Sequence, residues 1–296
     1  MMTLKQLLLT FPTEDTCRAF LQARRWPKGV TCPRCGKKET VYALANKAWH
    51  WECSNPKCRS GNAYRFSVLV GTVFENTKYP LRTWFEVLYT MLNSKKGVSS
   101  KQIERQIGSS YPTALYMTHR LRAGMQDSEF RQLMGVAEVD ETYIGGEEQN
   151  KHKKDRSHSG TGGIGSGRTG VIGAISRKGN IVCRVIEDVS TDTVEAFIKE
   201  TINDEVTLVA TDEYAGYQRL HKAYPRDTVR HAQGEYVRGS VHTENLDSFW
   251  ALLKRGIIGN CHSVSRKYLP LYLNQFAFRH SNRNYGDAFG LAIAGC

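Results

Sequence analysis

The chain has 296 residues, of which 40% are hydrophobic and 24% charged, with eight cysteines and a formal net charge of +12. This composition is typical of a globular protein with a sizeable core, and the length favours two domains. No apolar run approaches the roughly 18 residues of a membrane helix, and the first ten residues lack a signal-peptide pattern. We therefore expect a cytoplasmic protein that binds no membrane.

The excess of positive over negative charge is confined to the N-terminal part of the chain. Residues 1–136 hold 21 Lys and Arg against 9 Asp and Glu, whereas residues 137–296 hold 20 of each kind. A basic region joined to a balanced one favours capture of nucleic acid by the first and chemistry by the second. Charge alone leaves open the alternative that the basic surface is merely solvated.

The N-terminal part predicts a helical segment over residues 1–30 and a zinc ribbon over residues 31–75. Two cysteine pairs occur in short turn-like motifs, Cys32-Pro33-Arg34-Cys35-Gly36 and Cys53-Ser54-Asn55-Pro56-Lys57-Cys58, with β-like sequence between them. Four thiolates at this spacing predict a closed, structural Zn²⁺ site formed by Cys32, Cys35, Cys53 and Cys58. A redox Cys-x-x-Cys pair would not explain the second pair, and His50 is an alternative ligand.

Residues 80–128 predict a helix-turn-helix region that binds DNA. Pro80 precedes an amphipathic helix over 81–94, and Gly108 separates two further helices within 98–125. The apolar side of the last helix is assigned to Leu115, Met117 and Leu121. The side chains expected to face a DNA groove are Thr113, Tyr116, His119, Arg120 and Arg122.

The second half of the chain predicts an α/β fold, a mixed sheet with helices on its faces. A first strand carries Asp140 and ends at Gly145-Gly146, and residues 147–170 read as a mobile surface loop. The expected elements that follow are strands 171–177 and 180–189, helix 191–202, strand 206–210, helix 214–224 and strand 228–231, and then helices 242–256 and 263–283.

Three acidic positions in these elements predict a metal-dependent active site. Asp140 and Asp212 fall at strand ends, and Glu244 and Asp247 lie on the same face of a helix as Lys254. Three carboxylates can hold two Mg²⁺ (or Mn²⁺) ions for in-line phosphoryl transfer, and Lys254 would contact phosphate. Each acid alone is more often a surface charge or a helix cap. The neighbouring Glu141 and Glu213 are expected to point away from the site.

These motifs, in this order, resemble those of insertion-sequence transposases with an N-terminal zinc ribbon and a DDE-type, RNase H-like catalytic domain, here residues 136–285. The resemblance covers residues 15–285. It rests on Cys32-Pro33-Arg34-Cys35-Gly36, Phe66-Ser67 with Gly71-Thr72-Val73-Phe74, Val139-Asp140-Glu141-Thr142-Tyr143-Ile144-Gly145-Gly146, Thr211-Asp212-Glu213-Tyr214-Ala215-Gly216-Tyr217, and His242-Thr243 with Trp250-Ala251-Leu252-Leu253-Lys254-Arg255-Gly256.

The resemblance implies a nucleoid-associated DNA transposase that binds terminal inverted repeats and target DNA, cleaves and transfers strands, and forms a homo-oligomer on DNA ends. Relatives usually carry Glu where this chain has Asp247, and some use Asn, which would fit Asn245. The third acid is therefore Asp247, Glu244 or Asn245, and the acid–lysine spacing of the family favours Asp247. Two rival functions are a non-enzymatic DNA-binding regulator and an RNase H-like nuclease.

Overall fold

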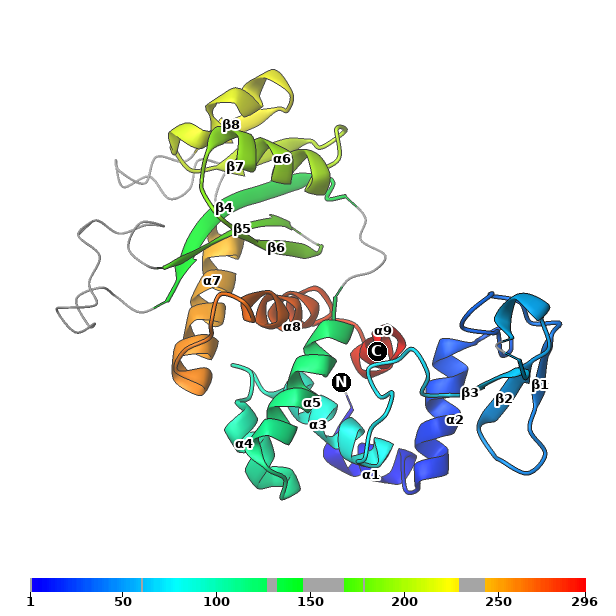
Figure 1. Ribbon diagram of the computed structural model, residues 1–296. Coiled ribbons are helices and arrows are strands. Elements are labelled where there is room, and N and C mark those ends of the chain that lie inside the picture. Colours follow the sequence, from blue (N-terminus) through cyan, green and yellow to red (C-terminus); the bar gives the residue numbers. More distant parts are fainter. Residues whose placement is uncertain (1, 60, 127–131, 146–167, 178, 229–242) are drawn as a thin grey trace. The chain divides into compact units, whose positions relative to one another are not determined.

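A computed structural model describes residues 2–59, 61–126, 132–145, 168–177, 179–228 and 243–296 (Figure 1). The chain forms two compact units. Unit 1 comprises residues 1–95, 100–126 and 285–296, and unit 2 comprises residues 96–99 and 127–284. None of the helices in the described ranges has the length and apolar character of a membrane span. Most of the loop expected at 147–170, and the end of the strand expected at 228–231, fall outside these ranges.

Unit 1 begins with two short helices, α1 (Leu4–Thr10) and α2 (Glu14–Arg25), separated at Pro12 as the sequence predicts. Each starts with a capping box, in which the hydroxyl of Thr3 or Thr13 accepts a hydrogen bond from a backbone N–H three residues later. Proline cannot continue a helix, so the chain turns between them.

The segment that carries the cysteines forms a small antiparallel sheet in the order β1 (Val41–Ala43), β2 (His50–Cys53), β3 (Tyr64–Ser67). Trp51 on β2 and Phe66 on β3 are cross-strand partners with stacked rings 6.0 Å apart, and Trp26 packs edge-on against Trp51. These rings provide the apolar core of a module that is otherwise rich in turns and charge.

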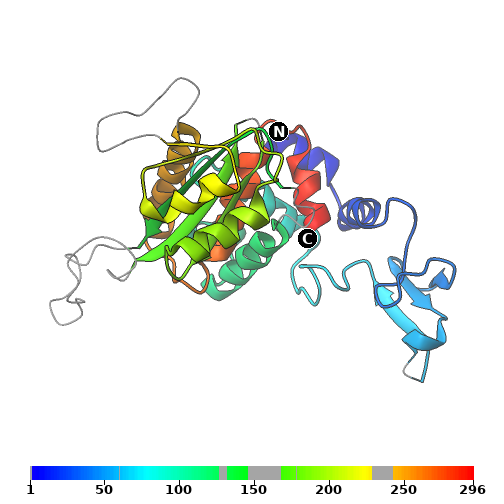
Figure 2. The same cartoon turned by 90° about the horizontal axis from the view of Figure 1, so that it is seen from above.

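The remaining helices of unit 1 are α3 (Leu81–Asn93), α4 (Ser100–Ile107), α5 (Tyr111–Gly124) and α9 (Ala288–Gly295). Helix α9, at the red end of the chain, lies beside the blue N-terminal helices (Figure 2). The sequence analysis did not predict α9. Its Phe289 contacts the rings of Phe11, Phe20 and Phe85, so the end of the chain completes the core of this unit.

The buried face of α5 differs from the predicted one. Ala114, Met117, Thr118 and Leu121 are at most 1% exposed, and the Thr118 hydroxyl pairs with that of Ser100 at 2.8 Å. This stripe is rotated from the one expected, because small and hydroxyl side chains at 114 and 118 pack inward. Arg122 is consequently 1% exposed, and the prediction that it faces a DNA groove is wrong.

Two more of the expected groove residues are turned toward protein. Arg120 donates hydrogen bonds to the carbonyl oxygens of Thr72 and Glu75, both at 3.1 Å. Burial, together with the Arg122 charge, lowers the pKa of His119 to about 4, so this ring is neutral at physiological pH. Tyr116 remains 49% exposed on the same helix.

Unit 2 is built on a five-stranded sheet in the order β6-β5-β4-β7-β8. Strands β4, β5 and β6 are antiparallel neighbours, whereas β7 runs parallel to β4 and β8 parallel to β7. The strands span Val136–Ile144 (β4), Thr169–Ser176 (β5), Ile181–Ile186 (β6), Leu208–Thr211 (β7) and Arg226–Thr228 (β8). The mixed sheet predicted from the sequence is confirmed.

Helices cover both faces of this sheet, with α6 on one side and α7 and α8 on the other (Figure 1). One core joins Ala137 and Val139 of β4 to α6 (Thr191–Thr201) and to the 3₁₀ segment η5 (Ala215–Lys222). The opposite core joins Ile144 and residues of β5 to α7 (Glu244–Gly256) and α8 (Leu269–Ser281). Alternate residues of β4 therefore face different helices.

Helix α7 continues into a π-helical turn, η7 (Ile257–Cys261), and α8 begins later than the predicted residue 263. Pro270 lies in the first turn of α8, where its missing N–H is tolerated. Gly256 permits the close approach of α7 and α8, since a Cβ there would lie 2.3 Å from the Phe276 ring. This packing fixes the helix that carries the third acidic candidate.

Candidate active site and metal centre

The four predicted zinc ligands come together in unit 1. Their sulfur atoms lie within 4.8 Å of one another, with Cys32 Sγ 3.8 Å from Cys58 Sγ and Cys35 Sγ 3.9 Å from Cys53 Sγ. A tetrahedron with Zn–S bonds of about 2.3 Å has edges of about 3.8 Å. The cluster therefore has the dimensions of a four-thiolate zinc site.

Local backbone geometry builds this cluster. The first pair lies on a turn in which the Gly36 N–H donates to the Cys32 carbonyl, and Gly36 has a φ of +71° that favours glycine. Cys53 ends β2, and Cys58 ends a single 3₁₀ turn. The Lys37 N–H donates a hydrogen bond to the Cys35 sulfur and, as the largest cause, lowers the pKa of that thiol to about 6. His50 lies outside the cluster and contacts the Ala48 carbonyl.

In unit 2, the parallel pairing of β4 and β7 sets Asp140 beside Asp212. The register pairs Glu138 with Ala210, and each aspartate comes two residues later, Asp140 within β4 and Asp212 just after β7. The position of Asp212 is held by Arg226, which donates to Thr211 Oγ1 at 2.9 Å and to the Asp212 carbonyl at 3.1 Å. Asp212 directly follows the last residue of β7, as expected, but Asp140 lies in the middle of β4 and not at a strand end. The strand continues to Ile144 because its pairing with β5 extends beyond its pairing with β7.

Asp140 is the most strongly perturbed acid of this region. Burial raises the pKa of its carboxyl group to about 7, and the negative charges of Glu141, Asp212 and Asp247 contribute in that order. Trp250 Nε1 donates to Asp140 Oδ2 at 2.9 Å, which acts in the opposite direction. The Trp250 ring lies over Gly173, the β5 partner of Asp140, where a Cβ would be only 2.7 Å from it.

Glu141, the neighbour of Asp140, points to the other face of the sheet as expected from strand alternation. Its Oε2 accepts a hydrogen bond of 2.6 Å from the hydroxyl of Tyr217, which is buried. Burial raises the pKa of Glu141, and the Tyr217 hydrogen bond opposes this effect. A buried tyrosine that holds Glu141 on that side leaves Asp140 as the acid facing α7.

The candidates on α7 occupy different environments. Asp247 is exposed and accepts a hydrogen bond from Thr243 Oγ1 at 3.2 Å, and its charge raises the pKa of Asp140. Glu244 is exposed at the first position of α7. Asn245 is half-buried and donates from Nδ2 to Glu138 Oε1 at 2.7 Å.

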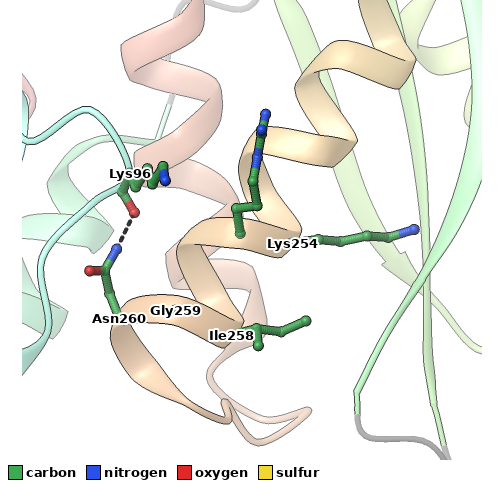
Figure 3. A pocket seen from close by; sticks show the side chains of 6 residues that line it. Lys96, Lys254, Ile258, Gly259 and Asn260 are labelled. Carbon is green, nitrogen blue, oxygen red and sulfur yellow. Dashed lines mark hydrogen bonds between the residues drawn. The ribbon is translucent and has the colours of Figure 1, made fainter.

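Lys254 is exposed two turns beyond Asp247 and lines an open pocket of about 470 Å³ (Figure 3). Lys96, Arg255, Ile258 and Asn260 contribute to the same pocket. The Asn260 amide donates to the Lys96 carbonyl at 2.7 Å, and the Lys254 side chain extends away from both residues (Figure 3). The pocket therefore brings three basic side chains, Lys96, Lys254 and Arg255, to one side of unit 2.

The acidic centre is looser than the thiol cluster. Within the described ranges, no group of three or more metal-ligating side chains other than the four cysteines lies within 4.8 Å of one another. The sequence did not predict a role in this site for Glu138, Tyr217, Arg226 or Trp250, although Tyr217 and Trp250 belong to the motifs of the resemblance. The sequence held one signal for Glu138: it is an acid two residues before Asp140 in the same strand, and hence on the same face of the sheet.

Comparison with known proteins identifies the families of the two regions that contain these residues. Residues 132–281 match the family profile described as ISXO2-like transposase domain, and residues 12–61 match a transposase zinc-ribbon domain. The chain is also 27% identical over 283 residues to "Uncharacterized protein in transposable element ISH50" from Halobacterium salinarum, covering 91% of this chain and 92% of that protein. The sheet that carries Asp140 and Asp212, and the helix that carries Asp247, lie within the first match. The chain therefore belongs to the family of insertion-sequence transposases with an ISXO2-like transposase domain and a transposase zinc ribbon.

Proposed function

We propose that this transposase binds the terminal inverted repeats of its element and catalyses metal-dependent cleavage and transfer of DNA strands in an RNase H-like unit 2. The sheet supports this fold: three antiparallel strands are followed by two parallel ones, in the order β6-β5-β4-β7-β8. The observation that carries the proposal is the packing of α7 on β4, where Trp250 Nε1 donates to Asp140 Oδ2 at 2.9 Å, together with the register of β4 and β7 that brings Asp212 near Asp140.

Asp140, Asp212 and Asp247 are the residues that would hold two divalent cations. All the donors are carboxylate oxygens, which suit Mg²⁺ or Mn²⁺, and their mutual repulsion is relieved by a cation. When bound, such a pair lowers the pKa of the attacking water or 3′-hydroxyl and stabilises the leaving oxygen of an in-line displacement. Asp247 is favoured over Glu244 and Asn245 because its charge acts on Asp140, whereas the Asn245 amide is bound to Glu138.

The protein side chains then have separable tasks. Trp250 and the Arg226 contacts fix the orientations of Asp140 and of the Asp212 backbone, and Lys254 neutralises phosphate charge along the exposed face of α7. Near neutral pH the Asp140 carboxyl is half protonated, so it loses a proton before it can act as a ligand. Carboxylates held in fixed orientations, such as those of Asp140 and Asp212, would position the reacting groups and stabilise the charge of the transition state.

DNA recognition is assigned to unit 1, which carries the basic excess of the sequence. The zinc ribbon would contact phosphates, and the α4–α5 hairpin would serve as a helix-turn-helix, with Tyr116 on the exposed side of α5. Two DNA ends must be held together during transposition, so we propose a homo-oligomer that assembles on DNA in the nucleoid. Binding through Lys and Arg predicts affinity that falls steeply with salt.

The test uses oligonucleotides that carry the inverted repeats flanking the gene, incubated with the full chain and Mg²⁺ or Mn²⁺. We expect cleavage at the repeat ends, lost in Asp140→Asn, Asp212→Asn and Asp247→Asn and retained in the neighbouring Glu213→Gln. DNA binding without cleavage under any metal would instead support a non-enzymatic regulator. Cleavage without preference for the repeats would support a general nuclease.

A further inference from the structure

Glu138 is a fully buried acid that holds the first turn of α7. Its side chain is 0% exposed on β4. Glu138 Oε2 accepts the backbone N–H groups of Asn245 at 3.1 Å and Leu246 at 3.3 Å, and Oε1 accepts the Asn245 side-chain amide at 2.7 Å. The carboxylate thus receives three hydrogen bonds from two consecutive residues that lie 107 and 108 positions later in the chain.

The Glu138 carboxylate takes the place of the usual N-terminal cap of α7. The first N–H groups of a helix lack partners within the helix, and a neighbouring Ser, Thr, Asp or Asn side chain commonly accepts one of them. Thr243, the residue before α7, makes no such hydrogen bond, and its hydroxyl donates to Asp247 instead. The negative charge of Glu138 also lies at the positive end of the helix dipole.

The charge of Glu138 is balanced from the sheet. Arg177, which follows β5, places Nε 3.6 Å from Glu138 Oε1, and the Arg177 N–H donates to the Val136 carbonyl on β4. A buried carboxylate is costly unless it is paired and hydrogen-bonded, and Glu138 has both kinds of partner.

The same face of β4 holds α7 at a second point. Glu138 and Asp140 are two residues apart, and Asp140 accepts the Trp250 indole hydrogen bond. Asp247 lies between the two attachment points, Asn245 and Trp250, on the helix. A shift or fraying of the first turn would therefore displace the third candidate ligand relative to Asp140.

We propose that Glu138 is a positioning residue of the active site, which anchors the first turn of α7 to β4 and so sets Asp247 in place for the divalent cations. This inference rests on the proposed function, because the task of Glu138 is defined by the metal centre. Glu138 itself does not contact DNA or the cations. Partners of this kind that orient metal ligands typically change metal affinity by about 10-fold to 100-fold when altered.

The decisive variant is Glu138→Gln, which keeps the size of the side chain and replaces one acceptor oxygen by a donor. The measurement is the Mn²⁺ concentration for half-maximal cleavage of repeat-end DNA, with zinc content, circular dichroism and DNA affinity recorded on the same samples. We expect about a tenfold or larger increase in that concentration, with DNA affinity and zinc content unchanged. Glu205→Gln, the same change at an exposed acid, should match the wild type.

Wild-type Mn²⁺ dependence in a less stable Glu138→Gln protein would show a merely structural role and overturn the proposal. If Glu138→Gln does not fold, Asn245→Ala removes one of the three contacts and should raise the Mn²⁺ requirement by a smaller factor; an unchanged requirement would overturn the proposal.

Hydrogen exchange separates this inference from the function on which it rests. If the wild type cleaves no DNA with any metal, the proposed function fails. The anchoring then stands only if the amides of Asn245 and Leu246 exchange faster in Glu138→Gln than in the wild type, and equal exchange rates would overturn it.

Discussion

The cysteine cluster of unit 1 and the proposed metal centre of unit 2 are built in opposite ways. The cysteine cluster of unit 1 comes from residues at most 26 positions apart, on two turns joined by β1 and β2. The acidic centre of unit 2 draws on β4, the end of β7 and the start of α7, and its first and last acids are 107 positions apart. The first arrangement is closed by local turns, whereas the second depends on sheet register and helix packing. The thiol cluster therefore depends on a short stretch of chain, whereas the proposed catalytic centre depends on the packing of the whole of unit 2.

The largest effect is expected from breaking the closed site. Cys53→Ser, or removal of zinc with a strong chelator, should unfold the ribbon, because a small module of this kind gains about 10 kcal/mol or more of folding free energy from its metal. Zinc analysis should find one tightly bound ion per wild-type chain. Limited proteolysis should then show new cleavage within residues 31–67 of the variant, and a metal-free wild type with a resistant ribbon would contradict the assignment.

The second largest effect is expected from removing the charge of Asp140 in the acidic centre of unit 2. Asp140→Asn keeps the shape of the side chain and removes the charge, so cleavage should fall by about a thousandfold, equivalent to about 4 kcal/mol of transition-state stabilisation. Single-turnover cleavage rates measure this effect. The fold should survive, since an amide is neutral like the protonated carboxyl, and unchanged circular dichroism serves as the control.

The raised pKa of Asp140 predicts how the acidic centre responds to pH. The carboxyl group has a pKa of about 7 in the metal-free fold, so it is mostly protonated at pH 6 and mostly ionised at pH 8. Because a bound cation requires the ionised form, the apparent Mn²⁺ affinity should fall about tenfold per pH unit below 7 and level off above it. Titration calorimetry at several pH values measures this slope. A flat profile from pH 5.5 to 8 would contradict the assignment.

The smallest effect is expected from Trp250→Phe. The change keeps an aromatic ring against Gly173 and removes the indole hydrogen bond to Asp140, which is worth about 1.5–3 kcal/mol for a charged acceptor. Loss of this donor should raise the pKa of Asp140 and move the pH dependence of metal binding upward. The direction of the shift is the test, and a downward shift would show that the indole does not stabilise the carboxylate.

The contrast between residues close in sequence and residues brought together by the fold also explains which parts of the two sites could be predicted. The four cysteines and Asp140 were identifiable because their spacing and their place after an apolar run carry the chemistry. Glu138 was not assigned a role, because its partners lie on a helix more than 100 residues later and only strand register brings them together. Arg122 was placed outward because the buried stripe of α5 uses Ala114 and Thr118, which no count of large apolar residues selects.

Helix α9 shows a further limit of the sequence pattern. Its eight residues are apolar on all sides, so no amphipathic period marks it as a helix. The helix is stabilised instead by tertiary packing, since Phe289 contacts aromatic rings of α2, of α3 and of the turn after α1. The match to the transposase domain ends at residue 281, before this helix begins.

The most direct test of the account is a crystal structure of the full chain soaked with Mn²⁺, with the metal located by its anomalous scattering. The account predicts anomalous density bounded by the carboxylates of Asp140, Asp212 and Asp247, and none there in crystals of Asp140→Asn. Density held instead by Glu141 or Glu244, or no density at these three carboxylates while the wild type cleaves DNA, would contradict it.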